Sequence, residues 1–174
     1  MSRSEGPVAF DIRAALPQML PRLVAFARTI VGDTDAARDL VQEAVVRALA
    51  AGRAPSEMPA FRAWMFAIVR NAAIDELRRR RAAKAEHAPG VDLWRYDNAC
   101  IAKITVEQGL LTLGPEHREI IALIDIAGFS YAEAAGILEI PPGTVMSRIA
   151  RARSALLAAI EASSLRPLKS KHGH

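Results

Sequence analysis

The sequence has one cysteine, few aromatic residues and no apolar run long enough to cross a membrane. The lone thiol, Cys100, excludes an internal disulfide framework and a zinc site built from the cysteines of one chain. The first residues also lack the apolar core of a signal peptide. We therefore expect a soluble protein of the cytoplasm, without membrane insertion.

The motifs of common enzyme classes are missing too. The chain has no phosphate-binding loop, no HExxH, no GxSxG, and no GxGxxG following a strand pattern. Its four histidines are scattered, and His117 fits a helix surface better than a site. We therefore expect no catalytic residue, no metal ligand and no cofactor, and we do not expect an enzyme.

What the chain does have is a helix-forming composition. Of its 174 residues, 51% are hydrophobic, 24% are charged and 5% are aromatic, and alanine is abundant. Small unbranched apolar residues favour packed helices, and no strand pattern occurs. The predicted fold class is therefore all-α, and the length allows one ordinary domain or two small ones.

Positive charge gathers in two separate segments. The net charge is +4 and the pI is about 9.7. Residues 60–90 hold seven basic and three acidic residues, and residues 142–174 hold six basic and one acidic. Two basic segments are typical of two contacts with a polyanion, although two solvated helix faces would give the same counts.

Helical periodicity stops once and restarts. Between residues 83 and 104 the pattern is lost, and Pro89 and Gly90 break the chain. We therefore predict one helical domain over 9–82, a flexible linker over 83–104, a second helical domain over 105–162 and a disordered tail over 163–174. Because the linker separates the domains, we expect the free protein to be extended in solution. The predicted helices cover about 10–31, 34–50, 60–82, 115–127, 130–138 and 144–162.

The second domain carries a predicted helix-turn-helix. Ser130 and Glu133 form a capping box for a short helix, and a turn over 139–143 precedes a basic helix capped by Thr144. At about 100° per residue, one face of that helix is apolar, and the opposite face carries Ser147, Ala150, Arg151 and Ser154. Small side chains beside arginines allow close approach to a DNA groove. An ordinary helical hairpin is the alternative.

Two further helix faces are candidate binding surfaces. In the helix over 60–82, Trp64, Asn71 and Arg78 lie seven residues apart and share one stripe, which suits an unstacked base and adjacent phosphates. Trp64 alone is better explained as a core residue, which leaves Asn71 as the candidate base reader. On the helix over 34–50, an acidic stripe with a bare valine, Val46, is a candidate protein-docking face.

Five segments together resemble the extracytoplasmic-function sigma factors, small two-domain transcription initiation factors of the sigma-70 family. DLVQE at 39–43 and FRAWMFAIVRNAAID at 61–75 resemble region 2 of that family. LGPEHRE at 113–119, SYAEAA at 130–135 and GTVMSRIARAR at 143–153 resemble region 4 and its helix-turn-helix. The order and the spacing of the segments make the resemblance specific, and it covers about residues 15–82 and 105–160.

The resemblance implies promoter recognition by a sigma factor in a stress response. The implied partners are core RNA polymerase, through its β′ clamp and β flap, promoter DNA and an anti-sigma factor. The polymerase-binding positions are Asp35, Asp39, Gln42, Glu43 and Val46. The −10 DNA positions are Arg53, Ser56, Trp64, Arg70, Asn71, Arg78 and Arg79. The −35 DNA positions are Thr144, Ser147, Arg148, Ala150, Arg151 and Arg153.

Two other functions fit parts of the sequence. A helix-turn-helix repressor or activator acting without core polymerase would use the second domain alone, and the first basic segment and the acidic stripe would be incidental. A scaffold of helical hairpins would show no salt-dependent binding to DNA.

Overall fold

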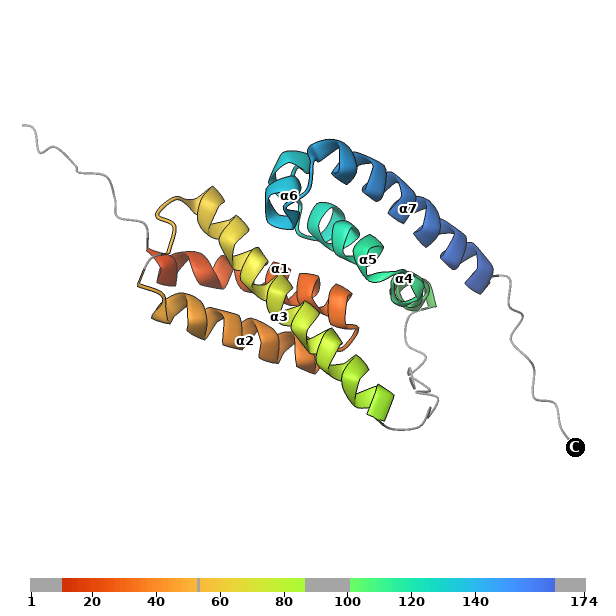
Figure 1. Ribbon diagram of the computed structural model, residues 1–174, viewed down its shortest axis with the longest axis horizontal. Coiled ribbons are helices and arrows are strands. Elements are labelled where there is room, and N and C mark those ends of the chain that lie inside the picture. Colours follow the sequence, from red (N-terminus) through yellow and green to blue (C-terminus); the bar gives the residue numbers. More distant parts are fainter. Residues whose placement is uncertain (1–10, 53, 87–100, 165–174) are drawn as a thin grey trace, which may run out of the picture.

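The computed structural model describes residues 11–52, 54–86 and 101–164, and every regular element in these ranges is helical, as predicted. The N-terminal half contains α1 (Ile12–Val31), α2 (Thr34–Ala50) and α3 (Met58–Glu86). The C-terminal half contains α4 (Ile101–Thr112), α5 (Pro115–Ile121), a π-helical segment η1 (Ala122–Ile126), α6 (Tyr131–Leu138) and α7 (Pro142–Ser164). The two halves lie side by side (Figure 1).

The first two helices begin and end at the signals that the sequence carries. The Asp11 carboxylate accepts from the backbone amide of Arg13 at 2.8 Å, and the Asp33 carboxylate accepts from that of Ala36 at 2.7 Å. Gly32 ends α1 in a left-handed conformation. The predicted apolar face of α2 is buried: Ala37, Leu40, Val41, Ala44 and Ala48.

The later boundaries differ from the prediction. Helix α7 begins at Pro142 rather than Thr144, because proline is tolerated in the first turn of a helix. The helix predicted over 115–127 changes to π-helical geometry at Ala122. Helix α3 runs on to Glu86 and α4 begins at Ile101, so both ends of the predicted linker are helical. Residues 87–100 of that linker, the first ten residues and residues 165–174 of the predicted tail lie outside the described residues.

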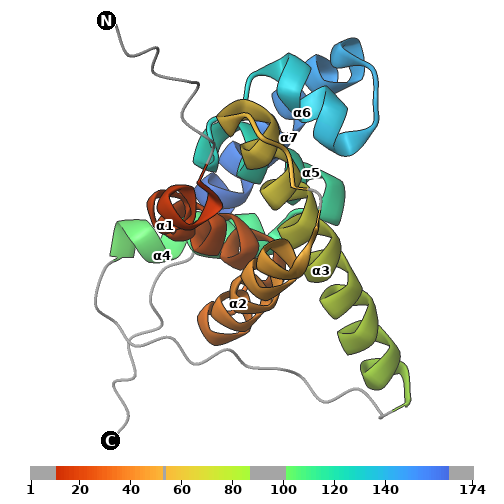
Figure 2. The ribbon, with the colours of Figure 1, turned by 90° about the vertical axis from the view of Figure 1, so that its left-hand side faces the viewer.

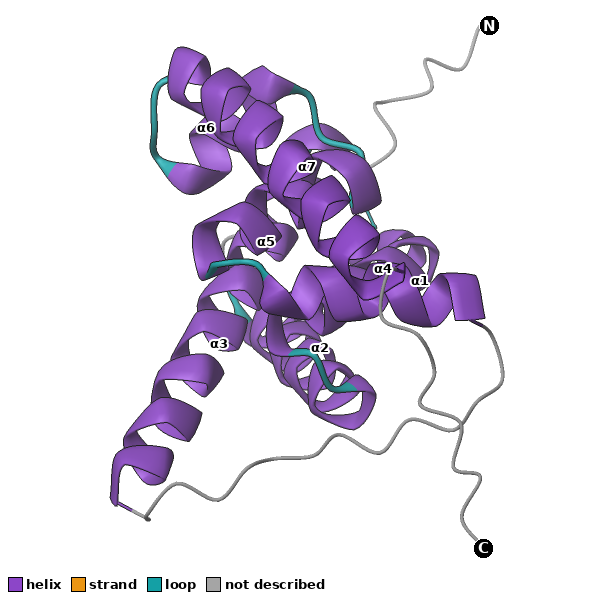
Figure 3. Ribbon diagram, turned by 90° about the vertical axis from the view of Figure 1, so that its right-hand side faces the viewer, coloured by secondary structure: helices purple, strands orange, loops and turns teal. Residues whose placement is uncertain are grey.

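The two halves pack against each other, so the expectation of an extended protein is wrong for this structure. Helix α1 contacts α4, α5 and η1, and α3 contacts α6. Buried side chains from both halves join in one core, which includes Phe26 and Phe66 from the first half and Ile120 and Leu123 from the second. Burying apolar surface between the halves contributes roughly 25 cal/mol per Å², which favours the closed arrangement. The last turns of α3 project beyond the packed helices (Figures 2 and 3).

Arg118 on α5 ties the ends of two other helices together. Its Nη1 donates to the carbonyl of Ile30 at 3.0 Å, and its Nη2 donates to those of Leu111 and Leu113 at 3.2 and 3.0 Å. These carbonyls lie at the C-terminal ends of α1 and α4, where helices leave acceptors unsatisfied. A single guanidinium therefore holds α1, α4 and α5 at the boundary between the halves.

Gly32 allows α1 and α4 to approach closely. Its φ is 77°, and a Cβ placed on it would lie 2.6 Å from Cδ2 of Leu111. Both the backbone conformation and the contact disfavour any side chain at this position.

We expect Gly32→Ala to lower the free energy of unfolding by about 1–3 kcal/mol, since it combines left-handed strain with a steric clash. Gly136→Ala is the matched control, because Gly136 lies in α6 with nothing within 4 Å of its added Cβ. The control should stabilise the protein slightly through better helix propensity. Urea denaturation followed by circular dichroism measures both changes, and equal stability of the two variants would contradict the close-approach argument.

Candidate functional site

The helix-turn-helix of the C-terminal half has the predicted capping box. The hydroxyl of Ser130 accepts from the backbone amide of Glu133 at 3.3 Å, and the Glu133 carboxylate accepts from the amide and the hydroxyl of Ser130 at 2.8 and 2.7 Å. Those hydrogen bonds from Ser130 lower the pKa of Glu133. Glu139 ends α6 with a φ of 56°, and the chain turns there into α7.

The outward face of α7 is the first candidate DNA surface. Val145, Ile149 and Ala152 are buried against α5 and α6, which leaves the opposite side of the helix open. Ser147, Ala150, Arg151, Arg153 and Ser154 are exposed, and Thr144 and Arg148 are partly buried at its edge. We call this set, without Ser154, the α7 face: Thr144, Ser147, Arg148, Ala150, Arg151 and Arg153.

The three arginines of the α7 face have different neighbours. Arg153 donates from Nη2 and Nε to the two carboxylate oxygens of Asp125 on η1, at 2.5 and 3.2 Å. Asp125 also raises the pKa of Arg153. Arg148 pairs with Glu116 on α5 at 3.4 Å. Arg151 instead donates to the carbonyl and the hydroxyl of Ser147, at 3.1 and 3.4 Å. Arg151 therefore presents a guanidinium held by neutral groups.

The second candidate DNA surface runs along α3. Trp64 is partly buried and packs on the core, with its ring 5.9 Å from that of Phe61, which agrees with its interpretation as a core residue. Asn71, Arg78 and Arg79 are exposed, and so is Ser56 in the loop before the helix. Arg53 lies outside the described residues. Arg78 and Arg79 pair with Asp75 and Glu76 on their own helix, at 3.4 and 3.0 Å.

Arg70 does not point into solvent with the rest of the α3 surface. Its Nε donates to the carboxylate of Glu119 on α5 at 2.5 Å, and its Nη1 donates to the amide oxygen of Asn71 at 3.3 Å. Within the described part of the chain, Glu119 is the only charged side chain that is buried. The candidate base reader is thus linked, through Arg70, to the other half of the protein.

The exposed face of α2 is the candidate protein-docking surface. Asp35, Asp39, Gln42 and Glu43 are exposed, and Val46 is 65% exposed beside them. Asp35 pairs with Arg38 at 3.3 Å and Glu43 with Arg47 at 2.5 Å along the helix. Asp39 and Glu43 also line a groove of about 310 Å³ toward Glu76, Arg79 and Arg80 of α3. Helix α2 packs on α1 and α3, which leaves this acidic face uncovered.

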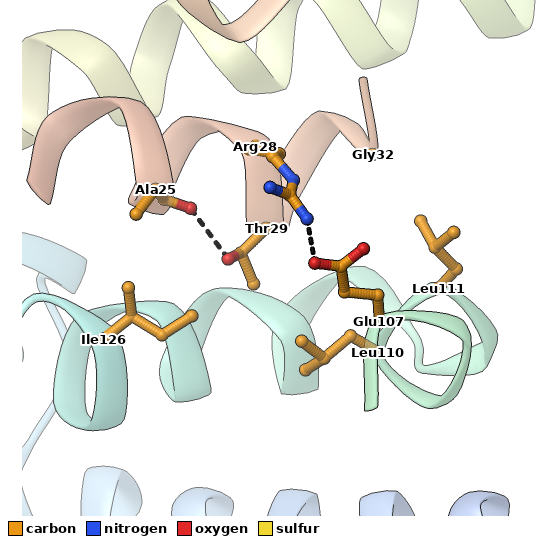
Figure 4. Close-up of a pocket in the computed structure, with 8 residues that line it drawn as sticks. All are labelled: Ala25, Arg28, Thr29, Gly32, Glu107, Leu110, Leu111 and Ile126. Carbon is orange, nitrogen blue, oxygen red and sulfur yellow. Dashed lines mark hydrogen bonds and ion pairs between the residues drawn. The ribbon is translucent and has the colours of Figure 1, made fainter. Parts of the chain in front are cut away.

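A smaller pocket of about 210 Å³ lies between the halves (Figure 4). An ion pair joins Arg28 of α1 to Glu107 of α4 at its edge, and the hydroxyl of Thr29 donates to the carbonyl of Ala25. The lining residues are Ala25, Arg28, Thr29, Gly32, Glu107, Leu110, Leu111 and Ile126. Its polar groups are thus engaged within the protein, and its remaining wall is largely apolar.

The described residues hold no group of three or more histidine, cysteine or acidic side chains arranged to bind a metal ion. In the same part of the chain, no helix combines the length and the apolar character that a membrane span needs.

The sequence analysis missed the acidic partners of the candidate DNA arginines. Glu116, Glu119 and Asp125 each pair with an arginine from 28 to 49 residues away. The one available signal was the position of Glu119 directly before an apolar run, where a carboxylate is buried only if it finds a cation.

Comparison with known proteins gives a consistent result in both halves of the chain. Residues 17–83 match the family described as Sigma-70 region 2, and residues 104–156 match Sigma-70, region 4. The chain is 36% identical over 160 residues to "ECF RNA polymerase sigma factor EcfG" of Rhodopseudomonas palustris, covering 87% of this chain and 86% of that protein. It is 34% identical over 158 residues to "ECF RNA polymerase sigma factor SigC" of Mycobacterium tuberculosis, covering 87% and 82%.

Two solved structures are similar over both halves. One is the sigma factor RpoE in complex with the anti-sigma factor NepR from Bartonella quintana, with a TM-score of 0.69, 30% identity and coverage of 87% of this chain and 97% of that one. The other is CnrH in complex with the cytosolic domain of CnrY, with a TM-score of 0.65, 31% identity and coverage of 87% and 90%.

The capping box leads to a prediction about α6. Ser130→Ala removes the N-cap and should cost about 1 kcal/mol of stability. It should also raise the pKa of Glu133 toward the ordinary value of 4.5. Because the pKa of Glu133 is lowered on folding, its contribution is present above that ordinary value and is lost as pH falls through the lowered pKa. NMR titration of the Glu133 carboxyl checks the shift, and an unchanged pKa in the variant would contradict it.

Proposed function

The chain belongs to the extracytoplasmic-function RNA polymerase sigma factors, and we propose that its three exposed faces divide the work of promoter recognition. The acidic face of α2 binds core polymerase, the α3 surface reads the −10 element and the α7 face reads the −35 element. The observation that carries this function is the match of 87% of the chain, across both halves, to proteins named as polymerase sigma factors. A helix-turn-helix regulator acting without polymerase is not favoured, since such a protein would not need the first half.

Polymerase binding is assigned to the acidic face of α2 because it offers charge and an apolar contact together. Carboxylates and an exposed valine on one helix fit a basic, partly apolar partner surface such as the β′ clamp. The region 4 half would supply the contact with the β flap. In this proposal, residues 9–82 form the unit for polymerase and the −10 element, and residues 105–162 form the unit for the −35 element.

The −10 role is assigned to Asn71 together with the other positions of the sequence prediction: Arg53, Ser56, Trp64, Arg70, Arg78 and Arg79. An exposed amide can read the edge of a base that has left the stack, and arginines beside it can hold the phosphates. Capturing such a base offsets the unstacking of the duplex, so strand opening needs no covalent chemistry. The chain therefore acts as an initiation factor in the cytoplasm, not as an enzyme.

The −35 role is assigned to the α7 face, in which Arg151 is the candidate base reader. Its guanidinium is held by Ser147 rather than by a carboxylate, so it can bond to a guanine edge without breaking an ion pair. Arg148 and Arg153 would contact phosphates. An anti-sigma factor is the expected inhibitor, because one similar structure is a sigma factor in complex with an anti-sigma factor.

The overall function is tested by run-off transcription. Purified protein added to core polymerase should direct initiation from defined sites on genomic fragments. A protein that binds DNA but directs no start site and forms no complex with core would be a plain regulator, and the proposal would fail.

The polymerase assignment predicts that Asp39→Lys combined with Glu43→Lys weakens binding to core polymerase by about 2 kcal/mol, or roughly thirtyfold in Kd. Both side chains are exposed, so circular dichroism should show an unchanged fold. Glu161→Lys, an exposed reversal on α7, serves as the control and should leave binding unchanged. Biolayer interferometry with immobilised core measures all three proteins, and equal affinities would remove α2 from the interface.

The two DNA assignments predict different failures for Arg151→Ala and Asn71→Ala. Loss of Arg151 should weaken binding to duplex −35 DNA by about 1–3 kcal/mol, because one good base contact is lost. Loss of Asn71 should spare duplex binding and reduce strand opening. Gel shift on duplex promoter and permanganate footprinting of the −10 region report the two steps. If both variants lose duplex binding equally, the division between the two faces is wrong.

A further inference from the structure

We propose that Glu119 is an internal anion that competes with promoter DNA for Arg70, so that the closed arrangement weakens DNA binding at the −10 surface. This inference rests on the proposed −10 role of the α3 surface and adds its regulation. We call the part of the interface between the halves that involves α3 the junction, and it includes two contacts. One is the Arg70–Glu119 ion pair, and the other is the packing of Arg62 and Phe66 on Phe129.

The ion pair engages two of the proposed −10 residues at once. The side chain of Arg70 is 23% exposed and that of Glu119 is 10% exposed, so water screens the pair poorly. Arg70 reaches the amide oxygen of Asn71 with a second nitrogen. While Glu119 holds Arg70, the carboxylate offsets the charge that the guanidinium would offer a phosphate, and the oxygen of the Asn71 amide is engaged by Arg70.

A carboxylate and a phosphate oxygen offer a guanidinium the same kind of charge-assisted hydrogen bond. A DNA phosphate can therefore take the place of the Glu119 carboxylate at Arg70 and form the same kind of hydrogen bond. The exposed pairs on the same helix, such as Arg78–Asp75, are open to solvent and contribute little. Among the residues of the α3 surface, Arg70 is the one at which exchanging a carboxylate for a phosphate would break a contact between the halves.

The second contact lies at the entrance to the helix-turn-helix. Arg62 donates to the carbonyl of Ala127 at 2.5 Å, and its guanidinium carbon lies 4.0 Å from the ring centroid of Phe129. The ring of Phe66 meets the same ring edge-on, with centroids 4.9 Å apart. Phe129 immediately precedes the cap of α6, so the junction fixes the helix-turn-helix to α3 while it holds Arg70.

The two DNA faces are thereby coupled through one interface. Opening the junction frees Arg70 and Asn71 and lets the α7 face move relative to α3, as a promoter with two separated elements requires. A protein that is mostly closed binds −10 DNA with an affinity reduced by the fraction that is open. An anti-sigma partner that favours the closed arrangement would strengthen a state that this chain already reaches with its own residues.

The test uses Glu119→Gln in the full chain, with Glu116→Gln as the matched control. Both glutamates lie on α5, but Glu116 pairs with Arg148 inside the same half. The probe is a fluorescein-labelled single-stranded DNA of random sequence, and the readouts are its fluorescence anisotropy and the radius of gyration from small-angle scattering. We expect Glu119→Gln to enlarge the particle and to bind the probe about tenfold more tightly. The control removes the same charge inside one half, so it should leave the particle size unchanged, and any gain in probe affinity from freeing Arg148 should be clearly smaller than that of Glu119→Gln.

Two further variants separate the closing of the two halves by the junction, which we call the latch, from the binding of DNA by Arg70. Arg62→Ala should open the particle and tighten probe binding, because it weakens the junction and leaves Arg70 in place. Arg70→Ala should open the particle without tightening, and adding Glu119→Gln to it should bring no further gain. Circular dichroism confirms that each variant is folded.

The outcomes distinguish the two levels of the proposal. If Glu119→Gln and Arg62→Ala leave size and probe affinity unchanged while run-off transcription succeeds, the latch is wrong and the sigma-factor function stands. If the particle opens but Arg70→Ala with Glu119→Gln still gains affinity, the competition for Arg70 is wrong. If neither the wild-type protein nor any variant directs run-off transcription with core polymerase, the proposed function itself fails.

Discussion

A buried carboxylate must find a cation, and in this protein the cation comes from the other half of the chain. Glu119 on α5 is buried against α3, where Arg70 neutralises it. Removing one partner of such a pair leaves a charge in a place that water reaches poorly, at a cost of about 3–5 kcal/mol. The contact therefore binds the halves to each other and holds Arg70 beside the exposed Asn71, to whose amide oxygen it also donates.

Basic residues of both proposed DNA surfaces are paired with carboxylates before any DNA arrives. Arg153 and Arg148 pair with residues of η1 and α5, and Arg78 and Arg79 pair within α3. Such pairing lowers the attraction to any polyanion, because each phosphate contact must displace a carboxylate. Arg151 is held by Ser147 and not by a carboxylate, so the readout proposed for it would not require the displacement of a carboxylate.

Local signals in the sequence predicted the helices, and long-range contacts explain what was missed. Capping residues and apolar periodicity gave α1, α2 and α6 nearly to the residue, because these signals act within one turn. The π-helical geometry after Ile121 is not encoded in apolar periodicity, and the start of α7 at Pro142 reflects the tolerance of proline in a first turn. The pairing of Glu119 with Arg70 joins residues 49 positions apart. The linker predicted from composition indicated that the two halves would be separate. They pack together because both carry apolar faces that are buried in one core.

Polymerase binding at α2 cannot by itself open the junction. The acidic face of α2 is exposed in the closed arrangement. Among the described residues, the helices on which α2 mainly packs, α1 and α3, belong to its own half. A partner that touches this face alone binds the closed and the open forms equally, and such a partner shifts no equilibrium. Opening must draw on contacts that differ between the forms. Under the proposed roles, promoter DNA would supply one at Arg70 and Asn71, and a second polymerase contact on the region 4 half would supply another if it lies farther from the first than the closed chain can span. In this proposal, capture by polymerase and release of Arg70 are therefore separable steps, and the strength of the junction sets how much of the second step the polymerase must drive.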